Sequence, residues 1–159
     1  MTPWIRWRSS HDQFVTVEKW LEHIFRIGQG PPDLPGVLDG VEEFCLAGAL
    51  ALETALDVRL IAEEILTNFV KYGRGDSAAL EVELRVAVSC EAVRMEFRDG
   101  GPSFNPLGVH PPDLQSPPEE RGVGGLGVHL VKSLVDAATY SREGSVNVLV
   151  LIKRLGSAI

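Results

Sequence analysis

The sequence feature that most constrains the fold is an alternation of apolar and polar side chains over residues 80–98. Residues 80–89 place an apolar side chain at every second position, and residues 93–98 do the same after a short turn at Cys90 and Glu91. Successive side chains of a strand point to opposite faces of a sheet. The alternation therefore predicts an antiparallel hairpin with one face in water.

A second hairpin is predicted near the end of the chain. Residues 138–142 and 146–154 have the pattern of two strands on either side of a turn that contains Gly144. The later strand is apolar at consecutive positions from Val148 to Ile152. A strand that is apolar on both faces is normally buried on both, so we expect it to be central or well covered.

Two helices are predicted before the first hairpin. Residues 37–52 carry apolar side chains at helical spacing, and residues 57–72 carry an apolar stripe in steps of three and four. Residues 22–28 either end an earlier helix or form a strand, because the turn-rich residues 28–36 follow in both cases. Together these elements predict an α/β two-layer sandwich with a largely antiparallel sheet.

Composition limits the partners. The chain has 159 residues and 45% hydrophobic residues, which suits one folded domain with a proper core. Its net charge of −7 argues against nucleic acid and against an anionic membrane, since both attract clustered Lys and Arg. No apolar run approaches the roughly 20 residues of a membrane span, and residues 1–10 lack the apolar core of a signal peptide. We therefore expect a cytoplasmic protein.

Cys45 and Cys90 indicate neither a disulfide framework nor a zinc site.

A glycine-rich segment runs directly into a helical pattern at residues 121–136, RGVGGLGVHLVKSLVD. Glycines allow close approach of another group, and the start of a helix offers unpaired N–H groups and the positive end of its dipole. The segment therefore suits an anion, most often phosphate. A flexible loop followed by an ordinary core helix is the alternative. The usual P-loop and dinucleotide motifs both fit poorly.

Two further groups of polar residues precede this segment. Glu64 and Asn68 stand four apart on the predicted helix, so they share one face as a magnesium ligand pair or as a base beside a ligand; a solvated pair on an exposed face is the alternative. Asp99 ends the predicted hairpin ahead of Gly100 and Gly101. Its carboxylate is able to accept a hydrogen bond from the exocyclic amine of adenine, although a simple turn explains the same residues. The long loop at residues 107–120 would then close over a bound nucleotide.

In their order and spacing, these three motifs resemble the N box and the two glycine boxes of the histidine-kinase-like ATPase superfamily, the group with the Bergerat ATP-binding fold. The resemblance rests on EEILTN at residues 63–68, DGGPSFNP at 99–106, GVGGLGVHLVKSLVD at 122–136 and the ending NVLVLIKRL. It is closest to the small anti-sigma-factor serine/threonine kinases, and it spans about residues 22–155. It implies a mixed, largely antiparallel sheet packed on about three helices.

The resemblance also implies roles for individual residues. Asn68 is similar to the residue that coordinates Mg²⁺ between the phosphates, and Glu64 to the catalytic general base. Asp99 is similar to the acid that recognises adenine, with Gly101 as the close-approach glycine beside it. The implied phosphate contacts are Gly122, Gly124, Gly125 and Gly127, with Arg121 as a further phosphate partner.

The chain departs from the family pattern in two places. Asn105 stands where the family commonly has Asp, which keeps an acceptor and loses a charge. Residues 1–20 have no counterpart in the shortest family members, so we expect an N-terminal extension, such as a dimer or partner arm, before a domain at residues 21–156. Neither departure affects the residues assigned to magnesium or adenine.

The function implied by the resemblance is that of an ATP- and Mg²⁺-dependent serine/threonine protein kinase that acts as an anti-sigma factor. Its substrate would be an anti-anti-sigma antagonist protein, its other partner a sigma factor, and a homodimer is a further expectation. One alternative is a nucleotide-dependent regulatory binding module without significant kinase activity. Another is a structural α/β domain that binds no nucleotide.

Overall fold

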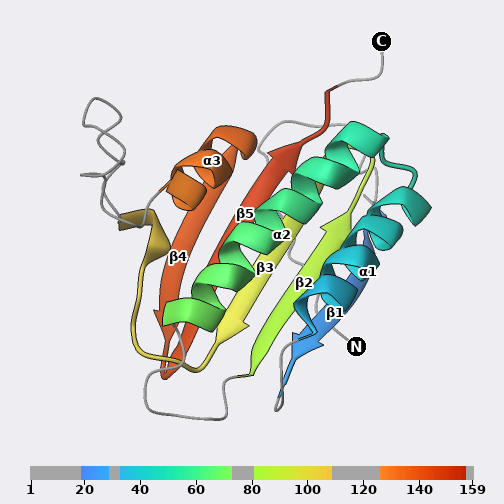
Figure 1. Ribbon diagram of the computed structural model, residues 1–159. Coiled ribbons are helices and arrows are strands. Elements are labelled where there is room, and N and C mark those ends of the chain that lie inside the picture. The colour runs from blue at the N-terminus through green and yellow to red at the C-terminus, as the bar shows by residue number, and fades with distance from the viewer. Residues whose placement is uncertain (1–18, 29–32, 73–80, 109–125, 157–159) are drawn as a thin grey trace, which may run out of the picture.

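The computed structural model describes residues 19–28, 33–72, 81–108 and 126–156. In these residues the chain forms two layers, a twisted five-stranded sheet and a set of helices that covers one of its faces (Figure 1). The elements in chain order are β1 (Leu21–Ile27), α1 (Leu34–Ala47), α2 (Leu52–Tyr72), β2 (Val82–Val88), β3 (Ala92–Asp99), the short 3₁₀ helix η1 (Pro106–Gly108), α3 (Leu126–Leu134), β4 (Ala137–Glu143) and β5 (Val146–Arg154).

The strands lie in the order β1-β2-β3-β5-β4, and each neighbouring pair is antiparallel. The predicted two-layer α/β sandwich is therefore confirmed, as are both predicted hairpins. Among the described strands there is no parallel pair, so the sheet is antiparallel where the resemblance implied a mixed one. Residues 21–27 form an edge strand rather than the end of a helix.

The side chains of β3 show why this strand lies in the middle of the sheet. Val93, Met95 and Phe97 are each at most 2% exposed, and they point toward the helices, while the residues between them face water on the open side. The ring centroid of Phe97 lies 6.3 Å from that of Phe69 on α2. Asp99 continues the same inward row, so the alternation places a carboxylate under the helix layer.

The boundaries of α1 and α2 differ from the predicted ones. Asp33 caps α1 by accepting a hydrogen bond from the N–H of Gly36 at 3.0 Å, so the helix begins at Leu34 instead of Val37. It ends before Gly48, because Ala49 adopts a positive φ of 63° and turns the chain. The second helix can therefore begin at Leu52, five residues earlier than predicted.

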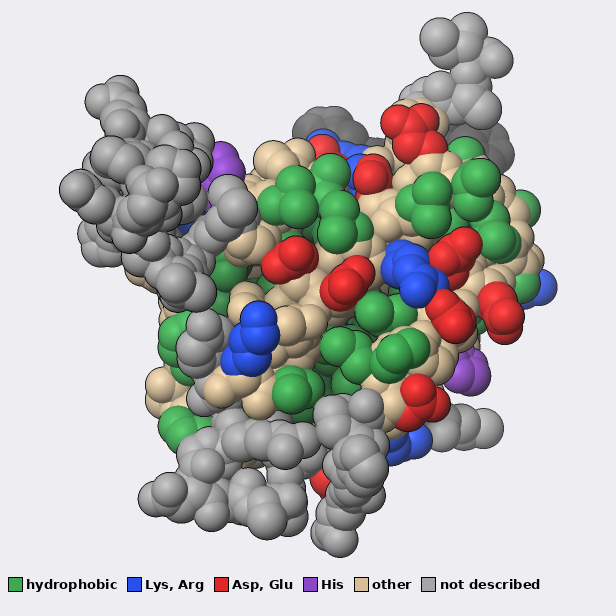
Figure 2. Space-filling view, viewed as in Figure 1, with side chains coloured by type: hydrophobic (Ala, Val, Ile, Leu, Met, Phe, Trp, Pro, Cys, Tyr) green, Lys and Arg blue, Asp and Glu red, His purple; other side chains and the backbone are tan. Residues whose placement is uncertain are grey.

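The helix layer buries the core and exposes acidic side chains outward. Helices α1 and α2 lie side by side over β1 to β3, while α3 lies over β4 and β5 (Figure 1). Figure 2 shows acidic side chains across the outer surface of this layer. Cys45 lies in the core, where burial raises the pKa of its thiol to about 11. None of the described helices has the length and apolarity required to cross a membrane.

Candidate functional site

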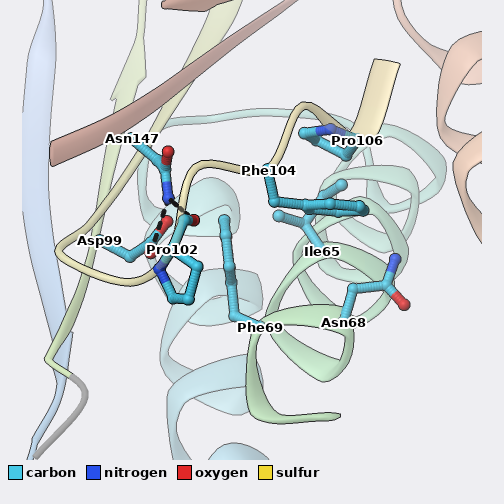
Figure 3. Close-up of a pocket in the computed structure, with 8 residues that line it drawn as sticks. All are labelled: Ile65, Asn68, Phe69, Asp99, Pro102, Phe104, Pro106 and Asn147. Atoms are coloured by element: carbon cyan, nitrogen blue, oxygen red, sulfur yellow. Dashed lines mark hydrogen bonds between the residues drawn. The ribbon is translucent and has the colours of Figure 1, made fainter. Parts of the chain in front are cut away.

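A pocket opens between α2, the end of β3 and the loop that follows β3 (Figure 3). Most of its wall is apolar, and three polar side chains reach it from three separate parts of the chain. The lining residues are Ile65, Asn68, Phe69, Asp99, Pro102, Phe104, Pro106 and Asn147. Flat apolar walls with a few fixed polar groups suit a ring-shaped ligand such as a nucleobase.

Asp99 is the buried charge of the pocket, with only 2% of its surface exposed. Its Oδ1 accepts hydrogen bonds from the N–H of Gly101 at 2.8 Å and from Nδ2 of Asn147 at 3.1 Å. Its Oδ2 is buried and has no hydrogen-bond partner among the described residues. A buried acceptor without a donor is costly, so this oxygen is matched to an N–H group that a ligand brings.

Sequence reasoning missed Asn147, which lies opposite Asp99 on β5 and is 3% exposed. Its Nδ2 also donates to the carbonyl of Pro102 at 2.9 Å. Its Oδ1 accepts from the hydroxyl of Tyr140 and from the guanidinium of Arg142, both at 2.7 Å. All the hydrogen-bonding groups of this amide are therefore used, and the amide is fixed against the Asp99 carboxylate. One signal in the sequence could have revealed Asn147. It is a polar residue at a position of β5 whose side chain points inward, in the same row as Leu149 and Leu151.

The loop after Asp99 is fixed from both sides. Arg142 on β4 donates to the carbonyl of Gly101 at 2.8 Å, and Lys132 on α3 donates to the carbonyl of Leu107 at 2.7 Å. Gly101 thus helps to fix the loop through its main-chain groups, because its N–H bonds Asp99 and its C=O bonds Arg142. Lys132 joins the end of this loop to the helix that follows the glycine-rich segment, so the third motif is linked directly to the residue that follows the second motif.

Glu64 and Asn68 lie one turn apart on α2, and both are partly exposed. Asn68 lines the same pocket as Asp99, and Figure 3 shows its amide on the opposite side, directed away from Asp99 and Asn147. Among the described residues, neither Glu64 nor Asn68 makes a hydrogen bond or an ion pair that would hold its side chain. Asn68 is therefore available to a ligand in the pocket, and Glu64, one turn before it, has no partner of its own within the described residues.

Gly127, in the first turn of α3, lies directly against Glu64. A Cβ atom at position 127 would overlap the Glu64 carboxylate and lie 3.0 Å from its carbon. Only glycine therefore fits here while the Glu64 side chain keeps its place. A carboxylate at this position also faces the positive end of the helix dipole. Glu64 and Gly127 thus bring the first and third motifs into contact. Asn68 and Asp99 bring the first and second motifs to one pocket.

The remaining predicted phosphate contacts, Arg121, Gly122, Gly124 and Gly125, lie outside the described residues. Within the described part, Glu64, Asn68, Asp99, Gly101 and Gly127 are brought to one end of the helix layer. No group of three His, Cys, Asp or Glu side chains in the described part of the chain is arranged to hold a metal ion. A cation at this end would therefore depend on ligands such as the amide oxygen of Asn68 and the oxygens of a bound phosphate.

Comparison with protein families agrees with this arrangement. The family model described as a histidine kinase-like ATPase domain matches residues 30–153, which is most of the chain. The chain belongs to the histidine kinase-like ATPase family. No curated protein matches the sequence.

Membership in this family makes the protein a nucleotide-binding ATPase module, which uses ATP for phosphotransfer or for hydrolysis. The histidine-kinase-like ATPase superfamily predicted from the sequence is thereby confirmed. The match does not extend to the anti-sigma-factor kinases within it. The free Oδ2 of Asp99 fits the 6-amino group of adenine, because that group is a donor and the oxygen lacks one. The amide of Asn68, which no hydrogen bond holds within the described residues, is able to meet the phosphates of the same ligand. The residues present therefore fit ATP.

Proposed function

We propose that this ATPase is a Mg²⁺-dependent serine/threonine protein kinase that acts as an anti-sigma factor, phosphorylates an anti-anti-sigma antagonist protein and binds a sigma factor when the antagonist is absent. The main support is the meeting of three motifs, in which Glu64 packs on Gly127 while Asn68 shares a pocket with Asp99. The resemblance of the motifs to those kinases supports the choice of substrate. The cytoplasm, where sigma factors act, is the proposed location.

The adenine end of the proposed site provides affinity and base selection. The Oδ2 of Asp99 accepts one hydrogen of the 6-amino group, and Asn147 holds the carboxylate in the required orientation. Phe104 and Ile65 provide apolar surface for the ring. Because the carboxylate is already oriented before binding, little conformational entropy is lost when the base enters.

The phosphate end of the proposed site provides the chemistry. Glu64 accepts the proton of the substrate serine or threonine hydroxyl as the oxygen attacks the γ-phosphorus, the bond to the β-phosphate bridging oxygen breaks, and ADP leaves. Asn68 would hold Mg²⁺ through its amide oxygen, and the ion would supply positive charge to neutralise the phosphates. Positioning and charge neutralisation are the main requirements of phosphoryl transfer, so a partly exposed carboxylate beside a helix start suits the role of base.

The decisive experiment follows label from [γ-³²P]ATP to a purified anti-anti-sigma antagonist protein. With Mg²⁺ present, the wild type should label a serine or threonine of the antagonist, and Glu64→Gln should lose at least about 100-fold in rate while ATP affinity changes less than about threefold. Glu91→Gln, at an exposed carboxylate in the turn between β2 and β3, is the control and should transfer normally.

Two outcomes would contradict the proposal. Undiminished transfer in Glu64→Gln would remove Glu64 as the base. Absence of any labelled serine or threonine under conditions where ATP binds would exclude the kinase and leave a regulatory module whose partner affinity depends on the nucleotide.

A further inference from the structure

Large apolar side chains are exposed together where α1 ends and α2 begins. Leu46, Leu52 and Leu56 are 41%, 57% and 45% exposed, and they make up three of the five most exposed large apolar side chains in the described residues. We refer to these three residues as the leucine corner. Figure 2 shows hydrophobic side chains gathered over this junction. A single exposed leucine is ordinary, but a group of them on one surface is typical of an interaction site.

The geometry of the helices explains why the leucines group. Leu52 and Leu56 are four residues apart in α2, so they lie on one face in successive turns. Leu46 lies in the last turn of α1, and the connection from Gly48 to Leu50 folds back tightly, with the N–H of Leu50 donating to the carbonyl of Cys45 at 3.1 Å. The corner is therefore held by rigid elements on both sides.

Acidic side chains surround the corner. Helices α1 and α2 together carry seven acidic residues and two basic ones. Arg59 pairs with Asp39 at 2.7 Å and with Glu42 at 3.0 Å, and Asp57 pairs with Lys153 at 3.0 Å. The pairs leave three exposed carboxylates that form no ion pair within the described residues. This acidic rim consists of Glu43, Glu53 and Glu63.

The rim lies on the same helix faces as the leucines. Glu43 precedes Leu46 by three residues, and Glu53 precedes Leu56 by three residues, which places each pair on neighbouring turns of one face. Glu63 follows Leu56 by seven residues, two turns further along the same side of α2. An apolar centre with carboxylates around it is the complement of an apolar stripe with lysines or arginines beside it.

We propose that the leucine corner and its acidic rim bind a basic amphipathic helix of a partner protein. The leucines cover the apolar stripe of that helix, and Glu43, Glu53 and Glu63 face its lysines or arginines. A second copy of this chain is a poor occupant, because it would bring like charges together. Anionic lipid and nucleic acid are poor occupants for the same reason.

This surface is distinct from the nucleotide site, although one helix carries residues of both. Leu56 precedes Glu64 by eight residues of α2, which is about 12 Å along the helix axis at 1.5 Å per residue. None of the leucines or rim residues lines the pocket. Substitutions of Leu52, Leu56, Glu43 and Glu53 should therefore leave ATP binding unchanged, and the proposal stands or fails independently of the kinase assignment.

The test uses the full chain and a labelled synthetic helical peptide of about 18 residues, with leucines at i, i+3, i+4 and i+7 spacing and lysines elsewhere. Fluorescence anisotropy should show binding that weakens with added salt. A peptide with glutamates in place of the lysines, and a peptide of the same composition in scrambled order, should each bind at least about tenfold more weakly.

Protein variants complete the test. The double variant Leu52→Ala and Leu56→Ala should bind the lysine peptide at least about tenfold more weakly, because both side chains lose their apolar contact area. Glu43→Lys with Glu53→Lys should weaken binding to a similar degree. Glu81→Lys is the control, since Glu81 is exposed before β2 and belongs to neither helix, and it should bind the peptide nearly as the wild type does. All variants should bind ATP with wild-type affinity.

Three results would overturn the proposal. One is lysine-peptide binding that is absent, or that is equal in the wild type and in the double leucine variant. A second is equal binding of the lysine and glutamate peptides. The third is a concentration-dependent dimer in sedimentation equilibrium that the double leucine variant dissociates, which would assign the corner to a second copy of the chain.

Discussion

The two ends of the nucleotide pocket are built in different ways. At the adenine end, Asp99 and Asn147 are buried and joined, and Tyr140 and Arg142 hold the amide from behind. At the phosphate end, Glu64 and Asn68 are partly exposed, and no hydrogen bond within the described residues fixes either one. If the proposed function holds, base recognition is formed in advance, whereas the proposed catalytic end would take its final arrangement from the nucleotide and the metal ion.

Burial explains the difference. A polar group that loses contact with water must find partners inside the protein, and the sheet offers them to Asp99 and Asn147 across the β3–β5 pair. Glu64 and Asn68 remain in contact with solvent, so water satisfies them until a ligand replaces it. A buried, fixed group such as Asp99 and a partly exposed, adaptable group such as Asn68 can thus line one pocket.

The largest effect that separates the two ends is expected from Asn68→Ala. Loss of the amide oxygen should weaken ATP binding in Mg²⁺ by at least about tenfold and leave the binding of adenosine unchanged, because only the phosphate end is altered. Isothermal titration calorimetry with both ligands measures this. Asn68→Asp, which keeps an oxygen ligand, is the control. Equal losses for ATP and adenosine would show that Asn68 belongs to the adenine end.

A somewhat smaller effect is expected from Gly127→Ala. The added Cβ displaces the flexible end of Glu64, so phosphoryl transfer should fall about tenfold while the free energy of unfolding changes by less than about 1 kcal/mol. Rates of label transfer and thermal unfolding check the two halves of this prediction. Gly100→Ala serves as the control, because nothing lies within 4 Å of the added atom. Full transfer in Gly127→Ala would mean that the position of Glu64 against α3 has no importance for transfer.

The smallest effect is expected from Asn147→Ala at the adenine end. Asp99 would lose one of its two donors, and affinity for ATP and adenosine should fall equally, by about five- to tenfold. Parallel titrations of both ligands provide the measurement, and Tyr140→Phe, which removes only a supporting hydroxyl, should give a weaker loss of the same kind. If Asn147→Ala affects ATP alone, the division of the pocket into two ends is wrong.

Period-two and helical patterns were sufficient to predict the layers and most of the strands. Alternation in residues 80–98 reflects a sheet with one buried face, and the structure has that hairpin as β2 and β3. The start of α1 and the boundary between α1 and α2 were predicted wrongly, because the first depends on the Asp33 cap and the second on the positive φ of Ala49. Neither feature contributes to hydrophobic periodicity.

The candidate site was predictable in part, through the resemblance of its motifs. That resemblance named Glu64, Asn68, Asp99 and Gly127, and the structure brings them to one end of the helix layer, while their roles remain predictions. Asn147 was not predicted, because its importance arises from Asp99 across the sheet, 48 residues earlier in the chain. The contact between Glu64 and Gly127 joins two helices and is likewise invisible to local patterns.

The central claim is that a purine with an amino group at position 6 binds against Asp99, and the direct measurement is a calorimetric titration of ATP and GTP with Mg²⁺. The Oδ2 of Asp99, which is buried without a hydrogen-bond partner, would accept from the amino group of adenine but would repel the oxygen of guanine. The wild type should therefore prefer ATP by at least about 100-fold, and Asp99→Asn should lose most of that preference. Equal binding of ATP and GTP by the wild type, or an unchanged preference in Asp99→Asn, would contradict the account.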